Sequence, residues 1–183
     1  MNYINLIIIQ GLLIMNGFLK FFLIILFFSS YPSFAHASLD SGDTSWVLTS
    51  TALVLFMTLP GLALFYAGLV QPKNVISVLM HHFSVACLCS IIWIIIGYSI
   101  AFSGDGLFFG NFDNFMMKSI NIESLSSSIP ESVFASFQMT FAIITPALII
   151  GAYVERIRFS VVLIFSSLWL IFVYCPITHM VWG

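Results

Sequence analysis

Charged side chains are scarce in this chain. Only 5 Lys and Arg and 7 Asp and Glu occur among 183 residues, so 7% of the chain is charged while 61% is hydrophobic. A soluble domain of this length usually has roughly 25% charged residues on and near its surface. The net charge of -2 includes no basic cluster that would favour nucleic acid. With a mean hydropathy of +1.12, the chain is expected to lie in a lipid bilayer.

Reactive and metal-binding groups are equally few. The 3 cysteines, Cys87, Cys89 and Cys175, all fall within apolar segments, where thiols commonly pack as small hydrophobic groups. The Cys-Leu-Cys spacing lacks the further ligands of a zinc site. The run Gly104-Asp105-Gly106 lacks the strand and helix that flank a phosphate loop, so a plain turn is expected there. No nucleophile is paired with a base. We therefore expect no metal, no cofactor and no enzymatic activity.

The first 37 residues have the pattern of a secretory signal peptide. A short apolar region at 21–28 is followed by the small-residue site Ala35-His36-Ala37, where cleavage would release a membrane domain at 38–183. The apolar run ahead of this region is unusual for a signal peptide, so we expect translation to start at Met15. The alternative is an uncleaved anchor helix.

Four apolar segments in the remaining chain are long enough to cross a bilayer as helices. The first is 25 residues, or about 37 Å as a helix. Pro60 and Pro146 each remove one helical hydrogen bond, and we expect a kink at Pro60. The sequence thus predicts an all-α membrane protein whose transmembrane helices cover 46–70, 75–102, 133–154 and 160–182, with a polar loop at 103–131.

Basic residues give the predicted orientation. Of the five Lys and Arg residues, four remain once Lys20 is removed with the signal peptide, and three of these lie in the two short turns, namely Lys73, Arg156 and Arg158. Cytoplasmic loops carry such an excess. The mature amino terminus and the acidic loop 103–131 are therefore expected outside, in a multi-pass protein of the bacterial inner membrane.

Three aromatic residues form the candidate site. Phe137 and Phe141 are four residues apart and so share one face of the predicted third helix. Trp182 ends the fourth helix, which returns to the same, outer membrane surface. Rings gathered there could hold a small cation against their π faces, each contributing about 0.5 to 2 kcal/mol. The alternative is ordinary, because Phe accounts for 20 of 183 residues and Trp near a helix end commonly anchors it at the interface.

The adjacent pair His81 and His82 suggests a proton relay within the second span. Neighbouring side chains on a helix point about 100° apart, however, so the two imidazoles cannot both face one narrow pore. We expect interfacial or packing roles for them.

Three sequence blocks resemble the ammonium transporter family. They are ALVLFMTLPGLALFYAG at 52–68, GAYVERIRF at 151–159 and PITHMVWG at 176–183. Their order and spacing match the first four helices of that family's bundle of about eleven, over roughly residues 43–183. The resemblance implies an amino-terminal portion of an ammonium transporter, ending after the fourth transmembrane helix.

The resemblance also implies roles for single residues. Trp182 and Phe137 match the aromatic groups of the family's outer ammonium-recruitment site, and Phe141 matches a ring that gates the pore below it. Ammonium would give up its proton there, and neutral ammonia would cross an apolar pore. The implied partners are two further copies in a homotrimer and a cytoplasmic protein that signals nitrogen status.

The family's paired pore histidines and second gate Phe would follow the last residue of this chain, which leaves three interpretations. The chain is a fragment of a transporter that moves ammonium when complete, or an ammonium-sensing membrane module completed by another chain, or an inactive truncated remnant. A separately encoded second half would favour a split transporter, and a neighbouring signalling domain would favour the sensor.

Overall fold

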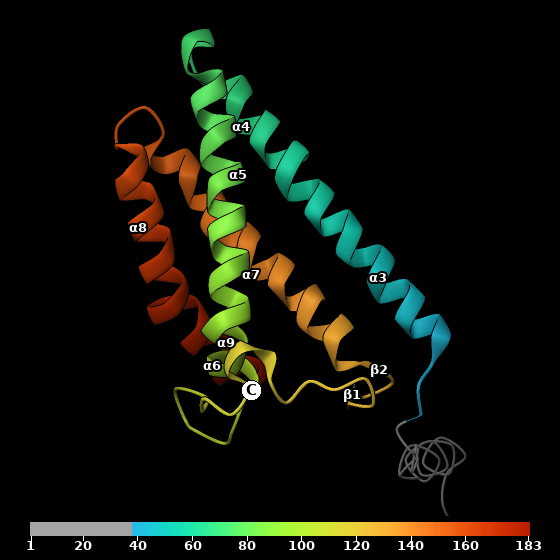
Figure 1. The fold of residues 1–183 in the computed structure, drawn as a ribbon. Coiled ribbons are helices and arrows are strands. Elements are labelled where there is room, and N and C mark those ends of the chain that lie inside the picture. Colours follow the sequence, from blue (N-terminus) through green and yellow to red (C-terminus); the bar gives the residue numbers. More distant parts are fainter. Residues whose placement is uncertain (1–37) are drawn as a thin grey trace, which may run out of the picture. The chain divides into compact units, whose positions relative to one another are not determined.

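The computed structural model describes residues 38–183, and the predicted signal peptide at 1–37 lies outside the described residues. Four helical spans in the described part are long and apolar enough to cross a membrane, namely Ser41–Leu69, Pro72–Phe102, Glu131–Tyr153 and Phe159–Trp182. The predicted all-α membrane architecture with four transmembrane helices is thereby confirmed (Figure 1).

The spans are divided into shorter elements where the helical geometry changes. The first comprises α3 (Ser41–Phe56), the π-helical η1 (Met57–Leu62) and α4 (Ala63–Leu69); the second comprises the 3₁₀ turn η2 (Pro72–Asn74), α5 (Val75–Ile92), the π-helical η3 (Trp93–Gly97) and α6 (Tyr98–Phe102). The third span is α7 (Glu131–Tyr153), and the fourth comprises α8 (Phe159–Trp169), the π-helical η5 (Leu170–Tyr174) and α9 (Cys175–Trp182).

The first helix starts five residues before the predicted boundary at 46. Asp40 provides the reason, because its carboxylate accepts a hydrogen bond from Asp43 N at 2.9 Å and its carbonyl accepts one from the Thr44 hydroxyl at 2.6 Å. A capping side chain of this kind satisfies amide groups that the first turn leaves free. The polar residues 41–45, which lie outside the predicted span 46–70, therefore form the first turn of α3.

The two prolines have different effects. Pro60 lies in the π-helical stretch η1, so the first span widens locally at the position of the expected kink. Pro146 is buried within α7, which stays α-helical from Glu131 to Tyr153.

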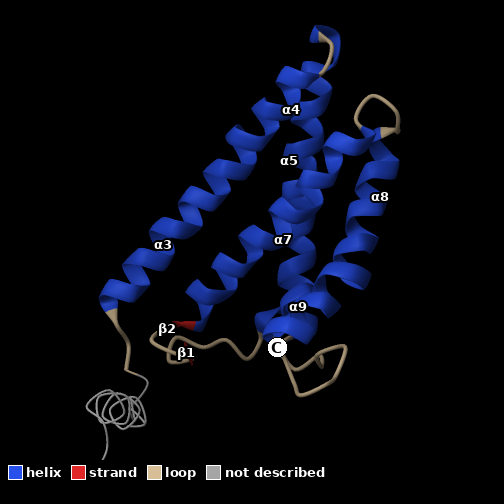
Figure 2. Ribbon diagram, turned by 180° about the vertical axis from the view of Figure 1, so that it is seen from behind, coloured by secondary structure: helices blue, strands red, loops and turns tan. Residues whose placement is uncertain are grey.

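The helices pack around α5 and α7, with α3 and α4 on one side of α5 and α8 on the other (Figures 1 and 2). Fully buried small residues on α7, Ala142 and Ala147, allow a close approach of neighbouring helices. The largest buried side chain is Trp93, whose indole N–H donates to the carbonyl of Ala135 at 3.1 Å. This bond joins the second span to the start of the third.

One end of the bundle carries the long loop 103–130, and we call it the loop end. The loop contains the 3₁₀ turn η4 (Phe115–Met117) and a two-stranded antiparallel hairpin, β1 (Leu125–Ser126) and β2 (Ile129–Pro130). These strands were not predicted from the sequence. The hairpin is tied to the first span, since Asp40 N donates to Ser128 O at 2.9 Å and the Ser128 hydroxyl donates to the Asp43 carboxylate at 2.5 Å.

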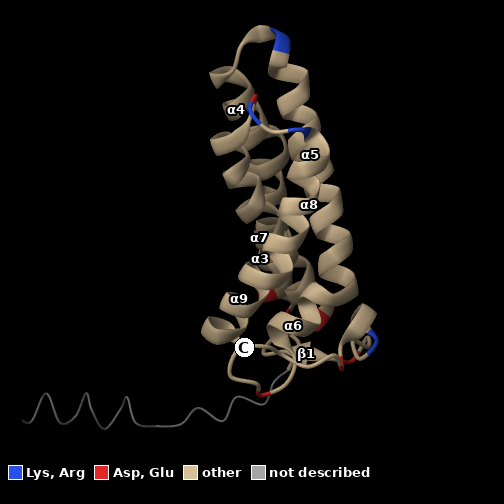
Figure 3. Cartoon of the chain, turned by 90° about the vertical axis from the view of Figure 1, so that its left-hand side faces the viewer, with Lys and Arg blue, Asp and Glu red and all other residues tan. Residues whose placement is uncertain are grey.

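The opposite end carries the two short turns, and we call it the turn end. Lys and Arg residues gather in these turns, while most Asp and Glu residues lie at the loop end (Figure 3). Glu155 joins the two turns, because its carboxylate accepts from Asn74 Nδ2 at 2.6 Å and from Gln71 N at 3.2 Å. These hydrogen bonds lower the pKa of Glu155 from its ordinary value.

Candidate functional site

The two phenylalanines of the candidate site lie on α7 and are in contact. The ring centroids of Phe137 and Phe141 are 5.0 Å apart, and the planes are inclined by 88°. This edge-to-face arrangement is favourable for two aromatic rings. The contact agrees with the predicted common helix face of the two residues.

Trp182, the last residue of α9, lines the same cavity as the two rings. The cavity measures about 630 Å³, and α7, α8, η5 and α9 supply its walls. Its lining residues are Phe137, Gln138, Phe141, Thr145, Trp169, Tyr174, Ile177, Thr178, Val181 and Trp182. The Trp182 side chain is 71% exposed and therefore stands at the rim of the cavity. The fold thus brings together the three residues that sequence reasoning singled out.

Two further aromatic residues of the cavity were missed. Trp169 directly precedes the π-helical η5, Tyr174 is its last residue, and their ring centroids are 6.4 Å apart. Tyr174 lies eight residues before Trp182, so regular helical periodicity places it on the same face of the fourth span. Trp169 lies five residues before Tyr174, and it reaches this face because a π-helical turn has more residues than an α-helical one.

The buried Trp93 supports the cavity from behind. Its ring lies 6.3 Å from Tyr174, edge to face, and its hydrogen bond to Ala135 fixes α7 two residues before Phe137. One side chain of the second span therefore positions walls contributed by the third and fourth spans.

The cavity is chemically suited to a small cation that can donate hydrogen bonds. Its walls are mainly rings and aliphatic groups, and no lining residue is acidic or basic. The rings offer π faces to a cation, while Gln138, Thr178 and Tyr174 offer oxygen atoms that accept from an N–H group. A volume of about 630 Å³ is also typical of pockets for small molecules.

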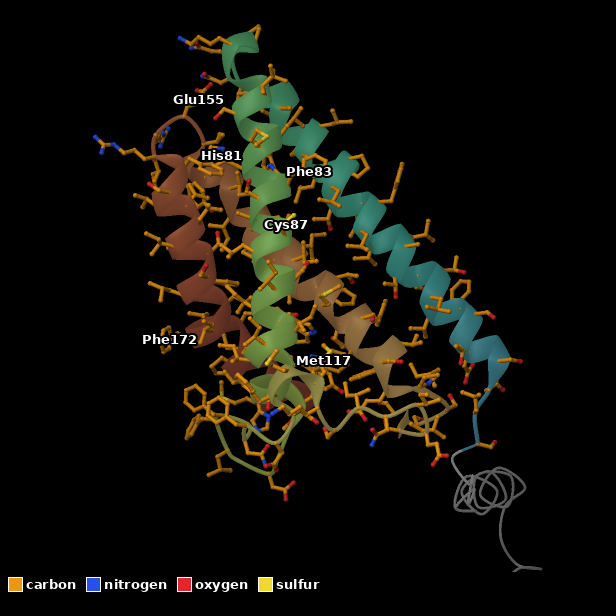
Figure 4. All side chains as sticks on the ribbon, viewed as in Figure 1. His81, Phe83, Cys87, Met117, Glu155 and Phe172 are labelled. Atoms are coloured by element: carbon orange, nitrogen blue, oxygen red, sulfur yellow. The ribbon has the colours of Figure 1, made fainter. Side chains whose placement is uncertain are left out.

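The adjacent histidines of α5 face different helices, and neither lines this cavity. His82 stacks on Tyr66 of α4 with ring centroids 5.5 Å apart, and His81 meets Phe159 of α8 edge-on at 5.1 Å. Both are buried, and His81 lies toward the turn end, as does Glu155, whereas Met117 marks the loop end (Figure 4). These contacts agree with the expected packing role.

The cysteines and acidic groups form no metal-binding cluster within residues 38–183. Cys89 and Cys175 are buried and Cys87 is exposed, each as a free thiol.

Four apolar helices with an aromatic cavity at one end and basic turns at the other define a polytopic membrane protein. The model of the ammonium transporter family matches residues 45–183, and the chain belongs to that family.

Curated relatives and solved structures agree with this assignment. The chain is 42% identical over 163 residues to an ammonium transporter of Aquifex aeolicus, covering 88% of this chain and 38% of that protein. It is 44% identical over 147 residues to one of Bacillus subtilis, covering 79% and 36%. The crystal structure of Saccharomyces cerevisiae Mep2 matches with a TM-score of 0.69 at 33% identity, over 79% of this chain and 33% of that one. The chain therefore spans about a third of the length of these relatives.

Proposed function

We propose that this chain provides the ammonium-recruitment site and the start of the passage through which an ammonium transporter moves its substrate. The observation that carries the proposal is the shared cavity of Phe137, Phe141 and Trp182 at the loop end. Membership of the family supports the choice of ammonium among small cations.

The proposed mechanism uses the rings to replace part of the water around ammonium. A full charge at the centre of a bilayer costs about 2.5 kcal/mol or more, so the ion has to be stabilised and then neutralised. Phe137 and Trp182 would hold ammonium at the mouth, with their π faces offsetting lost hydration. Ammonium would then divide into a proton and ammonia, and the neutral ammonia would pass Phe141 into the apolar interior. The paired pore histidines that the family resemblance implies would accept this proton and carry it separately.

The proposal includes a cellular setting. The basic turn end supports a cytoplasmic position for the turns, which puts the loop end and the mature amino terminus outside a bacterial inner membrane. Cleavage after Ala37 would free that terminus. Assembly as a homotrimer and docking of a cytoplasmic nitrogen-signal protein are the partners that the family implies.

An ammonium titration of the chain in lipid nanodiscs tests the site. Tryptophan emission should change on adding ammonium, since Trp169 and Trp182 both line the cavity. Replacing Phe137 or Trp182 by Leu should weaken the apparent affinity between about twofold and about thirtyfold, the range equivalent to one cation–π contact.

The matched control is Trp46→Leu. This indole is 73% exposed at the start of α3 and does not line the cavity, so its loss should leave the affinity unchanged. Equal affinities for the parent chain, Phe137→Leu and Trp182→Leu would exclude the aromatic cavity as the ammonium site.

A further inference from the structure

His179 is the one residue of α9 whose side chain joins the fourth span to two other segments. The residue is 3% exposed. Its Nδ1 lies 3.1 Å from the carbonyl oxygen of Ala101, and its Nε2 lies 2.7 Å from that of Gly106. Ala101 belongs to α6, whereas Gly106 belongs to the loop 103–130. Neither contact is needed to form α9 itself.

The geometry points to His179 as a positioning residue of the recruitment site: with both nitrogens protonated, its ring donates to Ala101 and Gly106 together and holds the loop and the Trp182 turn of α9 in place. The part of this inference that concerns Trp182 rests on the proposed function. The part that concerns the loop does not.

The two contacts place a specific demand on the ring. A neutral imidazole carries one N–H and one lone pair, while an imidazolium carries two N–H groups. Both neighbours of His179 are carbonyl oxygens, which only accept. A neutral ring therefore satisfies one contact and turns a lone pair toward the other oxygen, whereas a protonated ring satisfies both.

Acidic residues lie in the loop that His179 contacts. The elements packed against α9 are α6 and η5, whose titratable side chains are Tyr98 and Tyr174, and neither element contains a carboxylate, Lys or Arg. The loop that His179 contacts carries Asp105 next to Gly106, and Asp113, whose carboxylate accepts from the Asn111 amide. The basic residue of the loop, Lys118, lies beyond η4.

The carbonyls are themselves held in place. Ala101 lies in the last turn of α6, where carbonyl groups have no helical partner. Gly106 sits in a tight turn, since a Cβ there would come within 2.0 Å of the Phe109 carbonyl oxygen. The next part of the loop is fixed to α6 by a hydrogen bond from Gly110 N to Ile100 O at 2.9 Å, and to the C-cap residue of α6 by one from Asn111 N to Ser103 O at 2.8 Å.

The contacts of His179 affect the cavity because His179 and the cavity-lining residues lie on different sides of the same short helix, α9. Thr178 and Trp182 line the cavity, while His179 faces α6 and the loop. Gly183 N donates to the carbonyl of His179 at 2.8 Å, which closes the final turn around Trp182. Holding His179 therefore fixes the height and direction of the indole at the rim.

Hydrogen–deuterium exchange of the full chain in nanodiscs tests the loop contact without any ammonium. At about pH 5.5 and about pH 8, which bracket the change of charge of an ordinary imidazole, rates are corrected for intrinsic exchange. The amides of Gly110, Asn111 and the last turn of α9 should exchange more slowly at the lower pH.

His179→Ala should raise their rates between about twofold and about tenfold, the equivalent of one hydrogen bond, and should remove the pH dependence. His179→Gln, which keeps an N–H donor, should recover part of the protection at both pH values without a pH dependence.

Two further variants separate this role from general stability. His81→Gln also removes a buried imidazole, but one bound to its own helix at Ser77 O, 2.6 Å away, so loop exchange should keep its pH dependence. Gly106→Ala changes the loop partner of the contact and leaves the imidazole in place. By displacing the Gly106 carbonyl, it should abolish the pH dependence with His179 intact. Loop exchange with the same pH dependence in the parent, His179→Ala and Gly106→Ala would overturn the inference.

The ammonium titration of the same variants separates the two proposals. A parent chain that binds ammonium, with weaker binding in His179→Ala, supports both. A parent chain that does not bind ammonium but shows the pH-dependent protection refutes the proposed function and leaves the loop contact established. Lost protection with unchanged ammonium affinity would refute the positioning of Trp182 by His179.

Discussion

The loop end and the turn end of the bundle are held together by different interactions. At the loop end, rings pack around a cavity of about 630 Å³, and side-chain bonds run from helices to a long loop. At the turn end, Glu155 bridges two short turns, and Tyr66 packs directly against Gly151. The loop end therefore keeps space for a ligand, while the turn end uses close backbone approach and hydrogen bonds to fix the helices. Substitutions at the two ends should have correspondingly different effects on binding and on stability.

Trp93→Ala should have the largest effect, because this residue supports the loop end from within the core. It is 0% exposed and donates its indole N–H to Ala135. Replacing a buried Trp by Ala typically costs about 3 to 5 kcal/mol, and the variant should also lose ammonium binding as α7 and Tyr174 shift. Chemical unfolding in mixed micelles measures the loss.

The control for this change is Trp46→Ala, which removes an exposed indole from the same bundle. Its free energy of unfolding should stay within about 0.5 kcal/mol of the parent value, as for ordinary surface substitutions. A similar loss in both variants would show that Trp93 has no special place in the core.

Gly151→Ala should have an intermediate effect, confined to the turn end. A Cβ at this position would lie 2.2 Å from Cε1 of Tyr66, whose hydroxyl donates to Leu148 O at 2.9 Å. Overpacking of this kind costs about 1 to 3 kcal/mol. Thermal unfolding should reveal it, while the ammonium affinity of the distant cavity should not change.

Gly68→Ala is the matched control, since nothing lies within 4 Å of a Cβ at that position. Alanine is favoured over glycine in a helix by about 1 kcal/mol, so this variant should be slightly more stable than the parent. A loss of stability at Gly68 equal to that at Gly151 would contradict the close approach of Tyr66.

The helices follow from hydropathy, but the local geometry of the site does not. Long apolar runs predict the four spans because a bilayer requires each span to satisfy its own backbone. The relation of Phe137 to Phe141 follows from helical periodicity. The position of Trp169 beside Tyr174 depends instead on the π-helical η5, which begins directly after Trp169 and which hydropathy does not reveal. The hairpin at 125–130 likewise depends on long-range bonds from Asp40 and Asp43.

Glu155→Gln should have the smallest effect, and it should depend on pH. Hydrogen bonds from Asn74 and Gln71 lower the pKa of Glu155 in the folded chain. A group with a lowered folded pKa stabilises the fold above its unfolded pKa, about 4.3 for Glu, and this contribution disappears as the pH falls through the folded value.

The parent chain should therefore lose a little stability below about pH 4.3 relative to Glu155→Gln, whose amide still accepts but does not titrate in this range. Because Glu155 is fully exposed, solvent screens the interaction and the difference should be near the limit of measurement. Glu123→Gln, in the exposed loop at the other end, is the control and should follow the parent curve. If Glu155→Gln lost stability on acidification as steeply as the parent chain, the bridge between the two turns would not contribute to holding the turn end.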